Sequence, residues 1–199
     1  MGEPQSPSAI KAALGDKSIV MVGLMGCGKS AVGRRLASHL GLPFVDADDE
    51  IEKAAGKSIE DIFADHGEAY FREGERKVLA RLLHSGPQVL ATGGGAYMNA
   101  ETRAAIAQSG ISIWLKADLP LLLRRVAKRN NRPLLKNGDS ETVMRNLMEA
   151  RYPVYAGADL TVESRDVPHE AIVSEIMGRL ANTLSVQPPA EKKKNDDQD

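Results

Sequence analysis

Residues 18–38 limit what this chain can fold into more than any other stretch. A short apolar run at 18–22 is followed by GLMGCGKS at 23–30 and then by residues with helical spacing. This order of strand, glycine-rich loop and helix start, with the spacing G-x-x-x-x-G-K-S/T, is typical of a phosphate-binding loop. Glycines allow the tight turn, and loop N–H groups and the helix N-terminus attract phosphate oxygens. The alternative is a glycine-rich turn that binds no nucleotide.

If the loop binds ATP, its polar side chains have separate tasks. Lys29 is expected to reach the β- and γ-phosphates, and the Ser30 hydroxyl to ligate Mg²⁺. The expected cofactors are therefore ATP, as co-substrate, and Mg²⁺. The residues of this stretch expected to contact the nucleotide are Gly26, Cys27, Gly28, Lys29, Ser30 and Ala31.

Size and composition exclude several classes of protein. The 199 residues are enough for one α/β domain and too few for two ordinary ones. Lysine and arginine number 26 against 27 aspartates and glutamates, so no global charge favours nucleic acid or a membrane surface as partner. The single cysteine, Cys27, excludes an internal disulfide. No membrane span or signal peptide is recognisable, so a cytoplasmic location is expected. The protein is also expected to be a monomer.

The pattern of apolar runs predicts a single domain of the P-loop NTPase type. Short β-branched or apolar runs alternate with helical patterns, which favours a five-stranded parallel sheet with helices on both faces. The helix-rich segment at about 49–84 is too long for a simple crossover and is expected to form an inserted helical lobe. The polar, cationic segment at about 129–139 is expected to form a lid.

Both ends of the chain are expected to lie outside this domain. Residues 1–16 are interpreted as a flexible, weakly amphipathic N-terminal arm. Residues 186–199 contain almost no apolar side chains and are expected to form a disordered polar tail. The folded domain is therefore predicted to cover residues 17–185.

Polar residues follow two of the predicted strands. Asp46 and Asp48 come after the second strand, and ligands of open α/β sheets bind at the carboxyl ends of strands. Helix capping is the alternative role for these carboxylates. Gly93, Gly94 and Gly95 follow the third strand, where they indicate either a tight turn or a ligand pressed against the backbone. Taken in isolation, Arg72 is interpreted as a surface arginine paired with a nearby glutamate.

Several short motifs, taken in order, resemble the shikimate kinase family over about residues 17–184. The motifs are GLMGCGKS, DAD, FR, GGGA, RPLL and the arginine of ARYPVY. The resemblance implies transfer of a phosphoryl group from ATP to the 3-hydroxyl of shikimate, in aromatic amino acid biosynthesis. It also turns the interpretation of Arg72 from a surface ion pair to a ligand of the substrate.

The resemblance implies a role for each matching residue. The implied ligands of shikimate are Asp48, Arg72, Gly93, Gly94, Gly95 and Arg151. Asp46, with Ser30, is assigned to the magnesium shell, and Arg125 and Pro168 are assigned to the two sides of the adenine. Arg132 resembles a lid arginine that reaches the phosphates, which makes the implied catalytic residues Lys29, Asp48 and Arg132.

Shikimate has one carboxylate and three hydroxyls, which fits this set of residues. Two arginines can meet a carboxylate with planar forks, and an aspartate can accept the proton of a hydroxyl. Two other functions stay open at this stage. One is a different small-molecule kinase of the same architecture, such as a gluconate or nucleoside-monophosphate kinase, and the other is a non-catalytic nucleotide-binding switch or scaffold.

Overall fold

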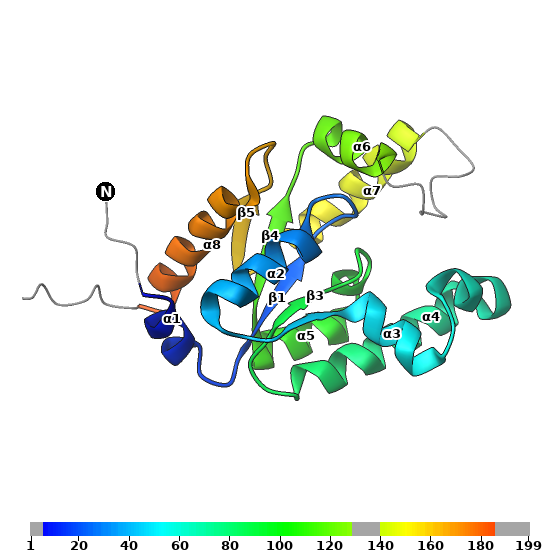
Figure 1. Ribbon diagram of the computed structural model, residues 1–199. Coiled ribbons are helices and arrows are strands. Elements are labelled where there is room, and N and C mark those ends of the chain that lie inside the picture. The colour runs from blue at the N-terminus through cyan, green and yellow to red at the C-terminus, as the bar shows by residue number, and fades with distance from the viewer. Residues whose placement is uncertain (1–5, 129–139, 186–199) are drawn as a thin grey trace, which may run out of the picture.

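The computed structural model describes residues 6–128 and 140–185, and within these a five-stranded parallel sheet forms the centre of the molecule (Figure 1). The strands stand in the order β2-β3-β1-β4-β5. Their bounds are β1 Ser18–Val22, β2 Phe44–Asp46, β3 Val89–Ala91, β4 Gly110–Lys116 and β5 Leu160–Glu163. The predicted α/β class and the parallel five-stranded sheet are confirmed.

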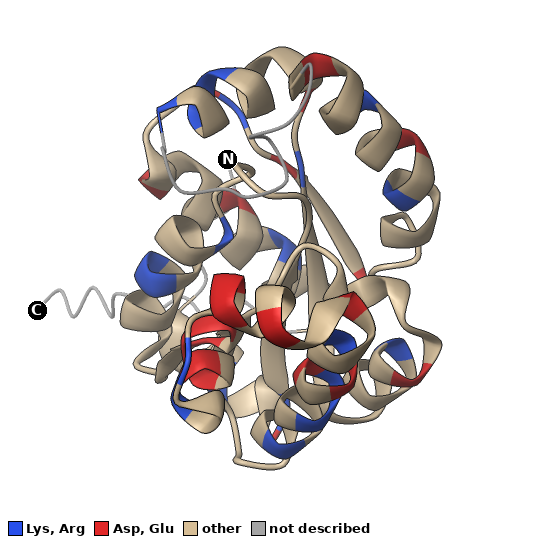
Figure 2. Ribbon diagram, turned by 90° about the vertical axis from the view of Figure 1, so that its right-hand side faces the viewer, with Lys and Arg blue, Asp and Glu red and all other residues tan. Residues whose placement is uncertain are grey.

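Helices connect the strands and cover the sheet (Figure 1). α1 and α8 pack against α2, and α5 contacts α4 and β4. The bounds are α1 Pro7–Leu14, α2 Lys29–Leu40, α3 Ala47–Ala55, α4 Ile59–Leu83, α5 Ala100–Ser109, α6 Leu119–Ala127, α7 Ser140–Tyr155 and α8 His169–Thr183, with a short 3₁₀ helix, η1, at Ala96–Met98. Lysines, arginines, aspartates and glutamates are spread over these helices, in keeping with the net charge of −1 (Figure 2).

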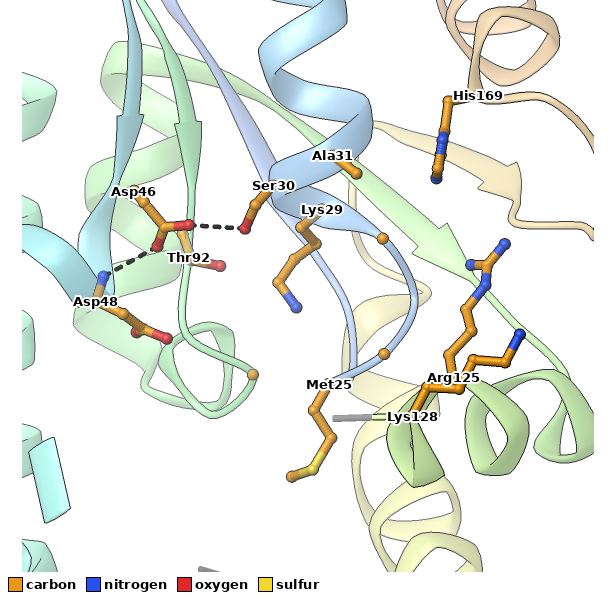
Figure 3. A pocket seen from close by; sticks show the side chains of 13 residues that line it. Met25, Lys29, Ser30, Ala31, Asp46, Asp48, Thr92, Arg125, Lys128 and His169 are labelled. Atoms are coloured by element: carbon orange, nitrogen blue, oxygen red, sulfur yellow. Dashed lines mark hydrogen bonds between the residues drawn. The ribbon is translucent and has the colours of Figure 1, made fainter. Parts of the chain in front are cut away.

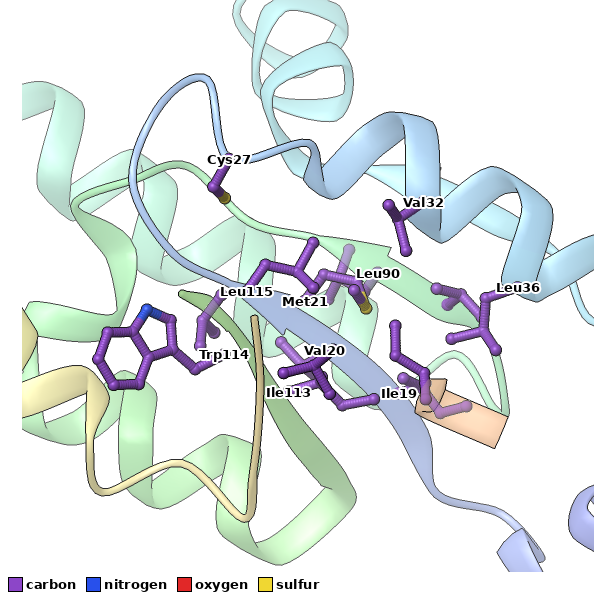
Figure 4. Packing of buried hydrophobic residues seen from close by; sticks show 14 of the residues in the cluster. Ile19, Val20, Met21, Cys27, Val32, Leu36, Leu90, Ile113, Trp114 and Leu115 are labelled. Carbon is purple, nitrogen blue, oxygen red and sulfur yellow. The ribbon is translucent and has the colours of Figure 1, made fainter. Parts of the chain in front are cut away.

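β1 is the central strand of the sheet and is buried along its whole length. It pairs in parallel with β3 and with β4, and all five of its residues are buried. Strands covered on both faces are continuous apolar runs rather than alternating ones, which is why SIVMV has no polar face. Ile19 and Met21 lie close to Val32 and Leu36 of α2 in Figure 4. The loop that follows β1, at residues 23–28, therefore begins at the middle of the sheet edge.

The segment between β2 and β3 consists of α3 and α4. Gly67, at φ 79° and ψ 179°, interrupts α4, and a small hydrophobic cluster of Ile51, Ile62 and Phe71 holds the two helices together. This cluster is separate from the main core of the sheet. The helices occupy the stretch for which an inserted lobe was expected.

The expected flexible arm at residues 1–16 is wrong for residues 7–14, which form α1. Ile10 is fully buried and Leu14 is 2% exposed, because α1 packs against α2 and α8. Lys11 also donates a 2.7 Å hydrogen bond from Nζ to the carbonyl of Gly41 at the end of α2. The expected lid at 129–139, with Arg132, and the expected tail at 186–199 lie outside the described residues. None of the helices described combines the length and the apolar character needed to cross a membrane.

Candidate active site

The loop between β1 and α2, here called the phosphate loop (residues 23–30), has the backbone shape that its sequence predicts. Gly23, Gly26 and Gly28 have φ values of 139°, 82° and 103°, which other residues rarely adopt. α2 begins at the next residue, Lys29. The Lys29 ammonium donates hydrogen bonds to the carbonyls of Gly23, at 2.8 Å, and Leu24, at 3.0 Å. A cation and a helix N-terminus therefore lie together at this loop, as anion binding requires.

Asp46 hydrogen-bonds both to the start of α3 and to the phosphate loop. Its Oδ1 accepts a 3.2 Å hydrogen bond from the Asp48 N–H and so caps α3. Its Oδ2 accepts a 2.7 Å hydrogen bond from the Ser30 hydroxyl across the site (Figure 3). Hydroxyl and carboxylate oxygens are the hard ligands that Mg²⁺ prefers, and Mg²⁺ usually takes only one or two carboxylates beside waters and phosphates. The Ser30–Asp46 pair therefore fits a magnesium ion.

A cavity of about 420 Å³ opens beside the phosphate loop at the carboxyl ends of the strands (Figure 3). Nine of the expected site residues line it, and Met25, Thr92, Lys128 and His169 line it as well. The nine are Gly26, Gly28, Lys29, Ser30, Ala31, Asp46, Asp48, Gly94 and Arg125. The cavity thus joins the phosphate loop to Asp48 and to the glycines that follow β3.

Arg125 fixes the wall of this cavity that lies opposite the carboxylates (Figure 3). It donates to the carbonyl of Cys27 at 3.2 Å, to the hydroxyl of Ser164 at 2.8 Å and to the carbonyl of Arg165 at 2.9 Å. Cys27 is buried and does not line the cavity. Its carbonyl also accepts a 2.7 Å hydrogen bond from the Ser164 hydroxyl. The phosphate loop is therefore hydrogen-bonded to the residue that follows β5.

His169, rather than Pro168, lines the cavity on the side of Arg125. Pro168 is the residue before α8, and His169, the first residue of that helix, points its ring toward the cavity (Figure 3). Partial burial, together with Arg35 and Arg125, lowers the pKa of His169 below its ordinary value, with Glu170 acting in the opposite direction. Sequence reasoning missed His169 because a single histidine at a helix start carries no distinctive pattern.

The glycines that follow β3, here called the triglycine loop (residues 93–95), bring the two expected arginines together. Arg151 donates a 2.9 Å hydrogen bond from Nη1 to the carbonyl of Gly94. A Cβ atom added to Gly95 would lie 2.6 Å from Nη2 of Arg72. The guanidinium groups of α4 and α7 therefore approach the same short loop, although neither arginine lines the 420 Å³ cavity.

Glu75 is a buried carboxylate beside this loop that the sequence did not single out. Its Oε2 accepts a 2.7 Å hydrogen bond from Arg72, and its Oε1 has no hydrogen-bond partner among the described residues. A Cβ atom added to Gly93 would lie 2.5 Å from Oε1 of Glu75 and 3.0 Å from Oδ1 of Asp48. Burial raises the pKa of Glu75, while Arg72 opposes that shift. The spacing of three residues from Arg72 on one helix was the available signal.

The alternative proposed for Arg72 is also partly correct. Its Nε and Nη2 hydrogen-bond to the exposed carboxylate of Glu68, at 3.2 and 3.1 Å, as an ordinary helix-surface pair would. Its Nη1, however, pairs with the buried Glu75, and its side chain is only 33% exposed. Arg72 is therefore held between an outer and an inner carboxylate, with its guanidinium against the triglycine loop.

The phosphate loop on the central strand, the Ser30–Asp46 pair and a cavity that continues to Asp48 define a P-loop small-molecule kinase. The family model "Shikimate kinase" matches residues 25–181. A shikimate kinase of Caulobacter vibrioides is 59% identical over 82% of this chain and 82% of its own length. One of Bradyrhizobium diazoefficiens is 56% identical over 94% of this chain and 92% of its own length. The chain belongs to the shikimate kinase family, and the resemblance seen in its motifs is confirmed.

The fold agrees with this family. The structure of a shikimate kinase from Acinetobacter baumannii, solved in complex with shikimate, superimposes with a TM-score of 0.83. It is 38% identical in sequence, and the match covers 87% of this chain and 98% of that one. The likeness therefore extends over essentially the whole domain of that enzyme.

Proposed function

We propose that this protein transfers the γ-phosphoryl group of ATP to the 3-hydroxyl of shikimate, giving shikimate 3-phosphate and ADP in aromatic amino acid biosynthesis. The observation that carries the proposal is the single cavity that reaches from the phosphate loop to Asp48 and Gly94. Donor and acceptor can meet in such a cavity without an intermediate on the protein.

In this proposal the triphosphate lies along the phosphate loop. Lys29 would leave the carbonyls of Gly23 and Leu24 and donate to the β- and γ-phosphates, since a phosphate oxygen is the stronger acceptor. Arg125 and His169 would flank the nucleoside, and Arg132, outside the described residues, would add a further cation. Ser30 and Asp46 would hold Mg²⁺, whose chemistry when bound is to neutralise charge on the phosphate oxygens.

In this proposal the acceptor lies beside the triglycine loop, next to the end of the cavity that Asp48 and Gly94 line. Arg72 and Arg151 would bind the carboxylate of shikimate with planar donor forks, which a lysine cannot supply. The triglycine loop would contact the ring through its backbone. Asp48 would orient the 3-hydroxyl and accept its proton as the phosphoryl group is transferred.

Charge and position then account for most of the rate enhancement. The transition state of phosphoryl transfer is loose, with charge spread over the equatorial oxygens, so fixed cations lower its energy more than that of the ground state. Lys29 already lies at the loop through its backbone hydrogen bonds. Nucleotide binding then requires only that the ammonium exchange these carbonyls for phosphate oxygens.

A different acceptor, such as gluconate or a nucleoside monophosphate, is the main competing proposal. The two arginines beside the triglycine loop favour an acceptor with a carboxylate. A non-catalytic nucleotide-binding scaffold is the other alternative, and the placement of Lys29, Asp48 and Ser30 along one cavity favours catalysis. We also infer a cytoplasmic monomer that uses neither nucleic acid nor a membrane as partner.

Measurement of ADP release with a panel of acceptors tests the proposal. Shikimate should stimulate ADP release in the presence of Mg²⁺, while gluconate and nucleoside monophosphates should not. Arg72→Ala should weaken shikimate binding, measured by calorimetry, far more than binding of an inert ATP analogue. Release that does not depend on shikimate, or equal weakening of both ligands, would overturn it.

A further inference from the structure

The carbonyl of Gly94 accepts hydrogen bonds from two side chains of α7. Arg151 donates from Nη1 at 2.9 Å, and Tyr155, one helical turn later, donates from its hydroxyl. A peptide bond is planar and trans, so a Gly94 carbonyl that faces α7 turns the N–H of Gly95 away from that helix. These two bonds therefore set the orientation of the peptide unit at the centre of the triglycine loop.

Tyr155 is the more permanent of the two donors. Its side chain is fully buried, and its ring lies 5.9 Å from that of Trp114 and 6.3 Å from that of Tyr97. Burial raises the pKa of its hydroxyl to about 12, so the group keeps its proton and remains a donor at neutral pH. Arg151, by contrast, is half-buried and belongs to the residues that bind the acceptor in the proposed function.

Three successive glycines have more backbone freedom than any other tripeptide, so the shape of this loop depends on contacts from outside it. Within the proposed function, Arg151 also has to turn its guanidinium toward the acceptor carboxylate. If Arg151 were the sole side-chain donor, that turn would leave the Gly94 carbonyl without any side-chain hydrogen bond. The loop would then be free to reorient. Tyr155 supplies the second donor.

We propose that Tyr155 is a positioning residue of the acceptor site. Its hydroxyl holds the Gly94 carbonyl, so that the triglycine loop keeps one orientation while Arg151 is recruited to the substrate carboxylate. Tyr155 itself does not touch the acceptor. The proposal rests on the proposed function because it takes shikimate as the acceptor that Arg151 binds.

Tyr155→Phe tests this directly, because it removes the hydroxyl and keeps the ring in its aromatic cluster. Arg151 then becomes the remaining side-chain donor to the Gly94 carbonyl, and acceptor binding has to break that bond. A neutral hydrogen bond contributes about 0.5–1.5 kcal/mol, so the KM for shikimate should rise roughly three- to tenfold. The KM for ATP should stay within about twofold of the wild type.

Tyr152→Phe is the matched control on the same helix. The Tyr152 hydroxyl donates to the carbonyl of Ala117 at the end of β4, its ring lies 4.9 Å from Trp114, and burial raises its pKa to about 12 as well. Both variants lose one hydroxyl that donates to a backbone carbonyl, so their thermal unfolding should change similarly. Only Tyr155→Phe should change the KM for shikimate, and equal effects of the two variants on that KM would overturn the proposal.

A double-mutant cycle with Arg151→Lys supplies a second, independent readout. If Tyr155 acts through the freedom of Arg151, the effect of Tyr155→Phe on the KM for shikimate should be smaller when residue 151 is already lysine. Fully additive effects would overturn the proposal. A wild type that releases ADP with shikimate, together with an unchanged Tyr155→Phe, would overturn this proposal alone. A wild type without shikimate-dependent ADP release would instead overturn the proposed function.

Discussion

Nη1 of Arg72 lies 2.7 Å from Oε2 of Glu75, and the Glu75 side chain is only 3% exposed. An ion pair placed this deeply stabilises the fold little, because desolvation of both charges offsets most of their attraction. Its main consequence is geometric. The guanidinium is held against the triglycine loop before any ligand arrives, which lowers the cost of ordering that side chain on binding.

Glu75→Gln should reveal the desolvation of the Glu75 carboxylate through the pH dependence of stability. Burial raises the pKa of Glu75 above its ordinary 4.5, so its contribution to folding is complete below about pH 4.5 and is lost as pH rises. Glutamine has no such loss. The free energy of unfolding of Glu75→Gln, relative to wild type in urea titrations, should therefore increase between pH 4.5 and 7, while the KM for shikimate increases as Arg72 loses its buried anchor.

Glu68→Gln is the control for that measurement, since Glu68 pairs with the same guanidinium but is 66% exposed. Its free energy of unfolding relative to wild type should stay nearly flat over the same pH range. If the free energy of unfolding of Glu75→Gln relative to wild type instead falls as pH rises, the carboxylate is stabilised, not destabilised, in the folded state.

Gly95→Ala should impair the acceptor site by steric contact alone. Gly95 has φ −100°, which alanine adopts without strain, but the new Cβ would lie 2.6–2.7 Å from three atoms of the Arg72 guanidinium. We expect the KM for shikimate to rise at least tenfold, with the KM for ATP little changed. Gly74→Ala, in α4 with open space around it, should leave both constants unchanged and stabilise the helix by about 0.5–1 kcal/mol. Equal steady-state constants for the two variants would contradict this steric explanation.

Lys29→Ala should lower the rate far more than it weakens acceptor binding. Removal of a preorganised cation or donor from a site of charge development typically lowers kcat about 10²–10³-fold. Shikimate affinity, measured by calorimetry, should change less than about threefold. Lys53→Ala, which removes a 71%-exposed lysine, is the control and should behave as wild type. A Lys29→Ala variant that kept its kcat would exclude this ammonium from the chemistry.

Ile10→Ala should show how strongly α1 is attached. The side chain is fully buried among the core residues, and truncation of such a side chain costs about 2–5 kcal/mol. The midpoint of urea denaturation should fall accordingly, while kcat and both KM values at 25 °C should match wild type. A loss below about 0.5 kcal/mol would mean that α1 is not part of the cooperative unit.

The sequence predicted the sheet and the phosphate loop well because each depends on local patterns. SIVMV is a continuous apolar run, and GLMGCGKS has one spacing with a physical meaning. β1 runs over Ser18–Val22, the bounds of the apolar run in the sequence. α1 was missed because eight residues with two buried side chains form a stable helix only against α2 and α8.

Contacts between distant segments explain the other omissions. Tyr155 and Gly94 are 61 residues apart, and no pattern near either residue indicates that they are hydrogen-bonded. His169 lines the cavity and Pro168 does not, which depends on how α8 is oriented at its first turn. Arg72 needed both kinds of information, because its pairing with Glu68 follows from helix spacing whereas its place beside Gly95 follows from the tertiary fold.

β3 lies between β1 and β2. Its carboxyl end therefore lies between the end of β1, which leads to Lys29, and the end of β2, which leads to Asp48. Adjacent strands are about 4.8 Å apart, so the ends of β1 and β2 are roughly 10 Å apart with the end of β3 between them. A Cβ atom at Gly93 would lie 2.5 Å from Oε1 of Glu75, and one at Gly95 would lie 2.6 Å from Nη2 of Arg72. The places of Glu75 and Arg72 thus depend on glycines in the triglycine loop, and a screen for altered acceptor choice should leave that loop untouched and vary α4 instead.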